Sequence, residues 1–310
     1  MGVRLYKEPE LANPDLIAGW PGIGNIGLIA VHTLARSLGA EEFGDIEPWD
    51  FFYPGKVSIK DGLLADLEFP SSKFSFWKGG TRDVLFFIGE EQPSYGTGMY
   101  AAGQKAYQMA NLVLDVGVKF GCQRVYTSGA CVSLVHHEMK PRVVSVVSAE
   151  KLIKEVEGYP NTILISQTEG REGDGDGEGV ITGLNGLLLG LAKKRGLEAI
   201  CLMGEIPDWL AGASLPYPKA SKSVLEVFAH VVGTEIDAGL LDYAIRQIET
   251  IIERGYERFP PEIKERYEQR KSIAREPSSP ITDKEAQWII NHIEELFSKT
   301  GDEEDAGESI

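Results

Sequence analysis

Glycines in the N-terminal part of the chain have the spacing of a dinucleotide-binding loop. Gly22, Gly24 and Gly27 follow a short apolar run and open a stretch of apolar residues at helical spacing. Such glycines let the backbone approach a phosphate closely and expose helix N-terminal amides to an anion. The full fingerprint also needs an acidic residue about 20 positions further on, after a second buried strand. Asp45 and Glu47 stand near that distance, but residues 40–45 are too polar for a buried parallel strand. We therefore favour a structural turn whose glycines permit close packing, and we retain nucleotide binding as the alternative.

Polar and small residues also follow three other predicted strands. Glu90 and Glu91 come after the buried run 83–89, Ser128 and Gly129 after 124–127, and Glu205 after 199–204. Because the carboxyl ends of parallel strands meet at one edge of a sheet, we expect these groups to converge on a pocket there. Its carboxylates suit a ribose or a cation more than a free phosphate. The alternative is that they satisfy nearby backbone amides. The candidate ligand-binding residues are Gly22, Gly24, Asn25, Gly27, Glu90, Glu91, Ser128, Gly129 and Glu205.

The residues that could carry catalysis do not form a recognisable set. Ser128 precedes His136 and His137, yet no Gly-x-Ser-x-Gly elbow and no acidic partner accompany them. The two histidines are predicted to be loop residues, since no third metal ligand is placed beside them by spacing. The acidic, glycine-rich segment 169–179 lacks the ligand order of a calcium loop and is predicted to be a flexible loop of open role. We predict no metal site and no cofactor, and we assign no catalytic residue.

The surrounding pattern predicts the elements that position these groups. Apolar runs and helical periodicity alternate along most of the chain, which is typical of an α/β fold with a mostly parallel sheet between two helical layers. The step Lys60-Asp61-Gly62 predicts a small β-hairpin excursion from that sheet. The expected strands are 16–20, 83–89, 124–127, 143–147, 163–165 and 199–204, and the expected helices are 24–38, 97–120, 150–157, 184–195, 219–232 and 235–254.

The composition shifts near Phe259-Pro260-Pro261, where charged residues become frequent. We predict an α/β/α core domain over residues 1–258 and a C-terminal helical extension over 259–297. Thr282 and Glu285 form a capping box for the last helix of that extension, whose apolar stripe must be buried on the core or on another subunit. Residues 298–310 are predicted to be an acidic disordered tail.

Composition excludes several classes of function. The chain has 310 residues, of which 43% are hydrophobic and 25% charged, with a formal net charge of −16. Such an acidic protein is unsuited to nucleic acid or to an anionic membrane, and no apolar run is long enough to span a bilayer. Cys122, Cys131 and Cys201 match no disulfide or zinc pattern. The absence of a signal-peptide pattern at the N-terminus then favours the cytoplasm.

Several of these segments together resemble the proteasome assembly chaperone family in its prokaryotic form. They are Gly19-Trp20-Pro21-Gly22-Ile23-Gly24-Asn25-Ile26-Gly27, Gly89-Glu90-Glu91-Gln92-Pro93, Thr127-Ser128-Gly129-Ala130 with Pro141-Arg142-Val143, Gly183-Leu184-Asn185-Gly186 with the following Leu187–Lys193, and Gly204-Glu205-Ile206-Pro207 with Pro216–Ala220. The resemblance implies a three-layer α/β/α domain similar to nucleoside phosphorylases and related hydrolases, assembled as a homo-oligomer. It also implies binding to proteasome α-subunits without established catalysis. Relatives that dock through a C-terminal hydrophobic-tyrosine-any tripeptide differ from this chain, which ends Glu308-Ser309-Ile310.

Two hypotheses follow for the function. The first is a non-catalytic, oligomeric chaperone-like protein that contacts partner subunits, including proteasome α-subunits, through the aromatic hairpin region and the last helix. The second is a protein or phosphorylase-like enzyme that binds a nucleoside-like molecule in the strand-end pocket. We favour the first, because the sequence shows no catalytic triad, metal cluster or phosphate-binding loop of the P-loop type.

Overall fold

A mixed β-sheet forms the centre of the molecule. The computed structural model describes residues 2–54, 57–79, 82–93, 103–168, 179–237, 239–272, 284 and 287–292. Within these residues nine strands form one sheet in the order β1-β3-β6-β7-β2-β8-β11-β9-β10. The strands are β1 (Val3–Leu5), β2 (Asp15–Gly19), β3 (Glu41–Ile46), β6 (Ser72–Trp77), β7 (Val84–Gly89), β8 (Arg124–Ser133), β9 (Val143–Val147), β10 (Thr162–Leu164) and β11 (Glu198–Pro207). The central strands β7, β2, β8 and β11 are parallel to their neighbours within this group.

The margins of the sheet differ from its centre. β1, β3, β6 and β7 pair antiparallel on one side, and β9 pairs antiparallel with β11 on the other before β10 joins it in parallel. Polar residues in β3 fit this place, because antiparallel marginal strands tolerate solvent on one face whereas central parallel strands do not. The predicted α/β fold with a parallel sheet at its centre is confirmed.

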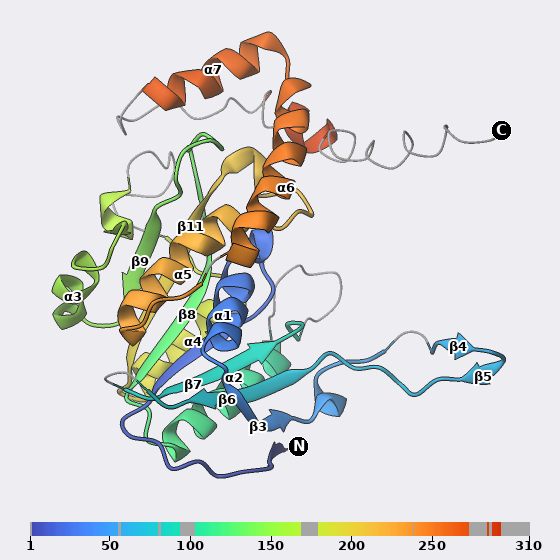
Figure 1. Cartoon of the computed structure of the whole chain (residues 1–310), viewed down its shortest axis with the longest axis vertical. Helices are drawn as coiled ribbons and strands as arrows, with labels where there is room; N and C mark the ends of the chain where they lie inside the picture. Colours follow the sequence, from blue (N-terminus) through green and yellow to red (C-terminus); the bar gives the residue numbers. More distant parts are fainter. Residues whose placement is uncertain are drawn as a thin grey trace.

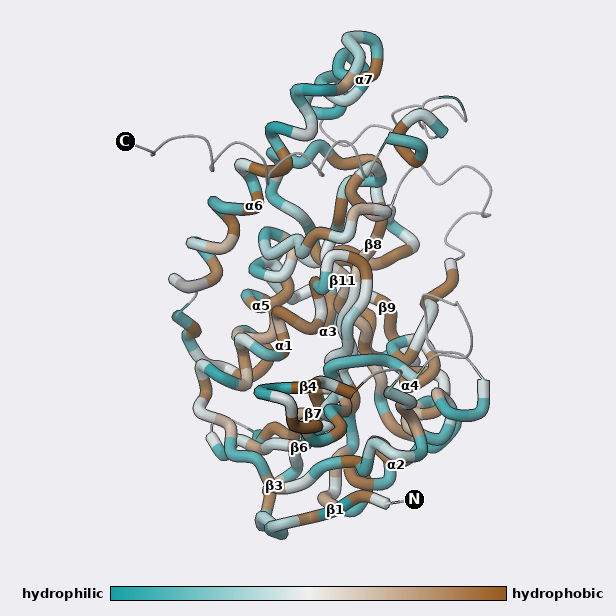
Figure 2. Tube along the Cα trace, turned by 90° about the vertical axis from the view of Figure 1, so that its right-hand side faces the viewer, coloured by the Kyte–Doolittle hydropathy of each residue, from teal (hydrophilic) through white to brown (hydrophobic). Residues whose placement is uncertain are grey.

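Helices cover both faces of the sheet (Figures 1 and 2). α1 packs with α5 on one face and α2 with α4 on the other. α6 packs on α5, which adds a further layer on that face. The helices are α1 (Ile26–Ser37), α2 (Gly103–Lys119), α3 (Ile153–Glu157), α4 (Gly183–Lys194), α5 (Pro218–Val232), α6 (Gly239–Glu257) and α7 (Pro261–Ser272). In the part of the chain that the structure describes, no helix combines the length and apolar character needed to cross a bilayer.

Alternation along β2 explains why two helical layers form. Ile17 belongs to the apolar cluster that includes α1 and α5, whereas Leu16 and Ala18 belong to the cluster that includes α2 and α4. All three side chains are buried. Since successive side chains of a strand point to opposite faces, a strand with apolar side chains on both faces must be covered on both sides.

A hairpin projects from the body of the molecule. β4 (Ile59–Lys60) and β5 (Leu63–Leu64) pair antiparallel with each other in a separate two-stranded sheet. Asp61 and Gly62 connect them with φ angles of 53° and 79°, as in the turn type that suits two-residue hairpin loops. Figure 1 shows this hairpin far from the central sheet. The predicted excursion is confirmed, and we call residues 57–69 the hairpin arm.

Two expectations about strand ends are wrong. β8 continues through Ser128 and Gly129 to Ser133, and β11 continues through Glu205 to Pro207. The two strands pair in parallel over this whole length, from Glu198 opposite Arg124 to Pro207 opposite Ser133. Small residues and a carboxylate therefore lie within these strands and do not end them. Some predicted features lie outside the described residues. They are the loop 169–178, residues 94–102 of the predicted second helix, residues 282 and 285 of the capping box, and the tail 298–310. Residues 287–292 of the predicted last helix are helical.

Candidate functional site

The glycine turn between β2 and α1 has a conformation that its sequence dictates. Gly24 and Asn25 both have left-handed backbones, with φ angles of 60° and 48°. Gly24 is also tightly packed, since a Cβ atom there would lie 3.0 Å from Cβ of Tyr217. Its carbonyl oxygen accepts a hydrogen bond of 2.7 Å from the Tyr217 amide. Glycine is therefore required at position 24 by both backbone conformation and space.

This turn forms one wall of a cavity of about 490 Å³ at the C-terminal end of β2 and β7. The cavity is lined by residues 21–25, by residues 90–92 after β7, and by residues 211–216 before α5. Gly22 is extended, with φ −168°, and a Cβ atom there would meet no atom within 4 Å. Position 22 therefore opens toward the cavity, and a residue with a side chain would fit there without strain.

The carboxylates after β7 give the cavity an acidic edge. Glu90 and Glu91 are both exposed and line it beside the glycine turn. The Glu90 carboxylate accepts a 2.8 Å hydrogen bond from the Ser71 amide, and the Glu90 amide donates to the Ser71 carbonyl. These contacts fix Glu90 at the rim. An ammonium group or a sugar hydroxyl would be the favourable partner for this edge, whereas a phosphate would be repelled.

Gln92 connects this edge to the other helical layer and was not among the predicted site residues. Its Nε2 donates to the Pro21 carbonyl at 2.6 Å, and its Oε1 accepts from the Leu184 amide at 2.9 Å. Gln92 therefore holds the glycine turn and the N-terminus of α4 together. Its place after two glutamates, within the segment Gly89–Pro93 that resembles the family, does not distinguish a bridging amide from a surface residue.

A neighbouring cavity of about 400 Å³ shares Glu91 and Gln92 with the first. Its other walls are the aromatic run Phe51, Phe52 and Tyr53 and the base of the hairpin arm. The acidic edge therefore separates two hollows, one against the glycine turn and one against the arm. The sequence indicated an aromatic hairpin region but not that Glu91 lines the same cavity as these rings.

Sequence and structural comparisons support one family. The profile of the PAC2 family matches residues 16–254, which is more than half of the chain. The chain belongs to the PAC2 family. The resemblance to proteasome assembly chaperones that its motifs indicated is confirmed by the same comparison and by structural neighbours.

Solved structures and a curated relative extend this finding. The crystal structure of Pyrococcus furiosus PbaB, an archaeal proteasome activator, is similar with a TM-score of 0.65 and 30% sequence identity over 81% of this chain and 97% of PbaB. Pyrococcus furiosus PbaA, an archaeal homolog of proteasome-assembly chaperone, shares the fold, with a TM-score of 0.56 and 21% identity over 88% of this chain and 100% of PbaA. Uncharacterized protein MJ1210 of Methanocaldococcus jannaschii is 29% identical over 253 residues, which cover 81% of this chain and 86% of that protein.

In this PAC2 protein only part of the predicted set lies at the cavity. Gly22, Gly24, Asn25, Glu90 and Glu91 line it together. The remaining members, Gly27, Ser128, Gly129 and Glu205, are not among its lining residues and have other contacts. Whether the cavity binds a ligand stays a prediction.

Gly27, Ser128 and Gly129 form a helix-to-strand contact. A Cβ atom on Gly27 would lie 2.2 Å from the Ser128 carbonyl oxygen, so only glycine lets α1 come this close to β8. The Ser128 hydroxyl is buried and donates to the Leu202 carbonyl at 2.7 Å. It is therefore a packing group on the neighbouring strand and not an available nucleophile, which argues against the hydrolase interpretation.

Glu205 is held in a buried ion pair. Its oxygens accept from Arg142 Nη2 at 2.7 Å, from Arg142 Nε at 2.9 Å and from the Arg142 amide at 2.9 Å. Such bidentate pairing uses the lone pairs that a ligand would need. The alternative that this carboxylate satisfies neighbouring groups is thus correct for Glu205.

The second requirement of a dinucleotide-binding site, an acidic residue at the end of the next parallel strand, is not met. Asp45 lies on β3, an antiparallel strand at the margin of the sheet, and not on a parallel strand beside β2. Its carboxylate accepts two hydrogen bonds of 2.8 Å from Arg4 and one from the Tyr6 hydroxyl. Asp45 therefore pairs two marginal strands and does not face the glycine turn.

Proposed function

We propose that this PAC2 protein is a non-catalytic, oligomeric chaperone-like protein of the cytoplasm that binds partner subunits of the proteasome α type through its hairpin arm. The exposed arm is the observation that carries the proposal. Side chains of Ile59, Leu63 and Leu64 are 71%, 74% and 76% exposed, respectively. An isolated two-stranded hairpin is marginally stable in water, and exposed apolar groups mark interaction sites.

Residues at the base of the arm extend this surface. Trp49 and Tyr53 are exposed, and Trp49 packs edge-on against Phe69 with ring centroids 4.7 Å apart. Aromatic side chains are enriched where partners bury interface area. PbaB is named a proteasome activator and PbaA a homolog of a proteasome-assembly chaperone, which supports an α-subunit partner. Buried cysteine thiols fit a reducing compartment.

The arm can be tested without disturbing the core. Leu63→Ser combined with Leu64→Ser replaces exposed side chains, so the melting temperature should stay unchanged. Burial of one such side chain at an interface contributes about 1.5–3 kcal/mol. We therefore expect at least about a tenfold loss of affinity for purified proteasome α-subunits, measured by biolayer interferometry. Val180→Ser and Tyr243→Ser, at other exposed apolar positions, should bind as the wild type does.

Light scattering after gel filtration gives the oligomeric state of the same variants. The proposal predicts a wild-type mass that is a multiple of the chain mass of 34.0 kDa. It fails if the wild-type protein does not bind α-subunits at any salt concentration, or if the arm variant binds with wild-type affinity.

The strand-end cavity supports a second candidate, the binding of a nucleoside-like molecule. Its volume and its mixture of backbone and carboxylate groups fit a ligand of that size. A thermal-shift screen should then show stabilisation by a nucleoside in the wild type and a smaller shift in Glu91→Gln. Glu157→Gln, an exposed change on α3, is the matched control. The absence of a shift with every nucleoside tested would eliminate this candidate.

A further inference from the structure

Two consecutive histidines are buried beneath the C-terminal helices. His136 and His137 lie in the loop between β8 and β9, and their side chains are 0% and 5% exposed. Their rings lie 4.2 Å apart and contact the Tyr256 ring of α6 at 5.4 and 4.6 Å, measured between centroids. The sequence pattern had placed them as ordinary loop residues. Burial of adjacent imidazoles is costly unless their nitrogen atoms have partners.

The imidazole of His137 has the arrangement of a metal ligand held by a second residue. Its Nε2 lies 3.1 Å from a carboxylate oxygen of Glu253 on α6, so Nε2 carries the proton and donates. Its Nδ1 is buried and has no hydrogen-bond partner among the described residues. A metal-binding histidine usually donates its other N–H group to a carboxylate in this way. The Nδ1 lone pair of His137 is thus available for an ion.

His136 contributes a second unpartnered nitrogen. Its Nε2 is buried, forms no hydrogen bond with the residues described, and lies 3.7 Å from an Oε1 atom of Glu268 on α7. Its Nδ1 accepts a long hydrogen bond of 3.2 Å from the Glu138 amide. Buried polar atoms are nearly always paired in folded proteins. Two unpaired nitrogens on adjacent residues therefore point to a group that binds between them.

Glu138 completes a cluster of ligand atoms. One ligand atom from each of His136, His137 and Glu138 lies within 4.8 Å of the others. Donor atoms of a tetrahedral ion with bonds of about 2.0–2.2 Å are separated by about 3.4 Å, so the side chains must move together by roughly 1 Å when the ion binds. Imidazole nitrogen with carboxylate oxygen is a donor set that suits zinc and similar ions.

The charges around the cluster already hold a cation. The Lys271 ammonium lies 2.9 Å from Glu138 and 2.8 Å from Glu268. Lys271 is partly exposed, so its ammonium can move into solvent when another cation takes its place.

We propose that His136, His137 and Glu138, together with Glu268, bind a divalent transition-metal ion of the zinc type that fastens α6 and α7 to the β8–β9 loop. The role is structural, because the four ligands come from the β8–β9 loop and from α7, so that a bound ion joins these two segments. Ligation through Nε2 of His136 places its ring proton on Nδ1, so the Glu138 amide must turn away from the ring. Residues 134–140 form bends and turns, which permit that movement.

The test uses the full chain, stripped of metal with a chelator. Calorimetric titration with zinc chloride should give one ion per chain, and added zinc should raise the melting temperature. Cobalt chloride should produce the visible absorption of a tetrahedral ion. Calcium chloride should produce neither effect, which separates this site from general attraction by an acidic protein with a net charge of −16.

Variants identify the ligands. Glu253→Ala removes the hydrogen-bond acceptor of His137 and should weaken zinc binding by about 10–100-fold. His137→Gln and Glu138→Gln should weaken it further. His32→Gln, an exposed histidine on α1, should leave it unchanged. Glu138 and Glu268 are exposed, so Glu138→Gln and Glu268→Gln decide the matter even if the histidine variants do not fold. The proposal is overturned if the wild type binds no stoichiometric zinc, or if these variants bind it equally well.

Discussion

At the scale of single residues, Gly27 sets the distance between the first helix and the sheet. The position where its Cβ would lie is 2.2 Å from the Ser128 carbonyl oxygen and 2.5 Å from its carbonyl carbon. Both atoms belong to the backbone of β8, which cannot turn aside as a flexible side chain can. Any larger residue must therefore push α1 away from the sheet.

Gly27→Ala should accordingly destabilise the protein by about 2–3 kcal/mol, as overpacking against backbone does. Urea unfolding followed by circular dichroism measures the change. Gly190→Ala is the matched control, because Gly190 is an exposed position of α4 with no atom within 4 Å of its ideal Cβ. It should stabilise the protein by up to about 1 kcal/mol through better helix propensity. Equal stabilities of the two variants would contradict the close contact at Gly27.

Residue types predicted the turn better than they predicted its neighbours. Glycine and asparagine adopt left-handed backbone conformations more readily than other residues, so the place of Gly24 and Asn25 in a turn was predictable. Ser128 and Glu205 were expected at strand ends but lie within longer strands. Their actual partners, the carbonyl of Leu202 and the side chain of Arg142, are separated from them by 74 and 63 residues, respectively. Local spacing contains no information about such pairs.

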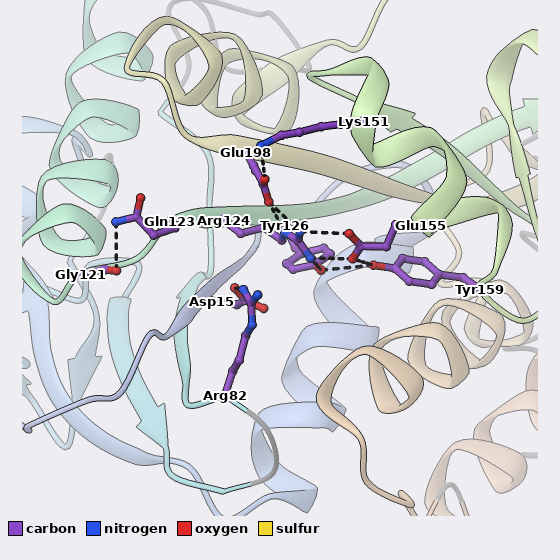
Figure 3. A network of polar contacts seen from close by, with 10 residues as sticks. All are labelled: Asp15, Arg82, Gly121, Gln123, Arg124, Tyr126, Lys151, Glu155, Tyr159 and Glu198. Atoms are coloured by element: carbon purple, nitrogen blue, oxygen red, sulfur yellow. Dashed lines mark hydrogen bonds and ion pairs between the residues drawn. The ribbon is translucent and has the colours of Figure 1, made fainter.

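At the scale of elements, a polar network fastens β8 and β11 to α3 (Figure 3). Arg124 on β8 donates to Glu198 on β11 at 2.6 and 2.8 Å and to Glu155 on α3 at 2.6 and 3.0 Å. Lys151 reaches Glu198 from the other side at 2.7 Å. Burial alone raises the pKa of Glu198, but the bonds from Lys151 and Arg124 outweigh burial and lower it overall.

The lowered pKa of Glu198 predicts a pH-dependent contribution to stability. A carboxyl group whose pKa is lower in the folded than in the unfolded state stabilises the fold at pH values above its unfolded pKa. This stabilisation is lost as the pH falls through the folded pKa. Glu198→Gln should therefore lower the free energy of unfolding by about 1–2 kcal/mol at pH 7. The difference from wild type should shrink below about pH 4.

Unfolding titrations at several pH values measure this contribution. The exposed change Glu157→Gln should have little effect at any pH. A Glu198→Gln penalty that stays constant down to pH 3 would show that the charge is not what stabilises the pairing.

The order of elements was predictable, but the margin of the sheet was not. Buried strands such as β7 are recognisable in the sequence as continuous apolar runs, and helices such as α5 are recognisable by the helical spacing of their apolar residues. β3 is polar, which correctly excluded a central parallel strand. Its partner β1 comes from the start of the chain, and the Arg4–Asp45 pair that joins them spans 41 residues. Only the folded structure reveals that pairing.

At the scale of the whole molecule, α7 is tied to the core by buried polar groups. Arg270 is buried and lies 3.0 Å from Asp208, which follows β11. The Tyr267 hydroxyl donates to the same carboxylate at 2.8 Å, and the Arg270 guanidinium stacks on the Tyr267 ring at 4.0 Å. Phe259, Ile263 and Tyr267 also belong to the apolar cluster that contains α1 and α5. Residues on both sides of the predicted boundary at residue 258 thus pack together, and the division into a core domain and a helical extension over 259–297 stays a prediction.

Asp208→Ala should test how firmly α7 is attached. It leaves the buried Arg270 without its carboxylate, a loss that costs about 3–5 kcal/mol for a buried pair. Hydrogen exchange should show faster exchange of amides in 261–272 while β8 and β11 stay protected. Glu265→Gln, exposed on the same helix, should leave exchange unchanged. Uniform loss of protection across the molecule would instead show that α7 and the sheet unfold as one unit.

The fold, the family and five of the residues that line the cavity could be predicted from the sequence, because they depend on local pattern and on motifs. The surroundings of His136 and His137 could not. These residues are buried by α6 and α7, whose contacting residues Glu253, Tyr256 and Glu268 lie more than 100 positions further along the chain. Sequence periodicity is a local signal, so it does not predict that a loop contacts a helix more than 100 residues away.

The hairpin arm has a consequence for how such a protein diversifies. Because the side chains of Ile59, Leu63 and Leu64 point into solvent, changes there cost the interior little. The glycine contacts beneath α1 tolerate almost no variation. Under the proposed function, selection can therefore alter partner recognition at the tip while the scaffold is inherited intact, and exchanging the tip between relatives would transfer the choice of partner.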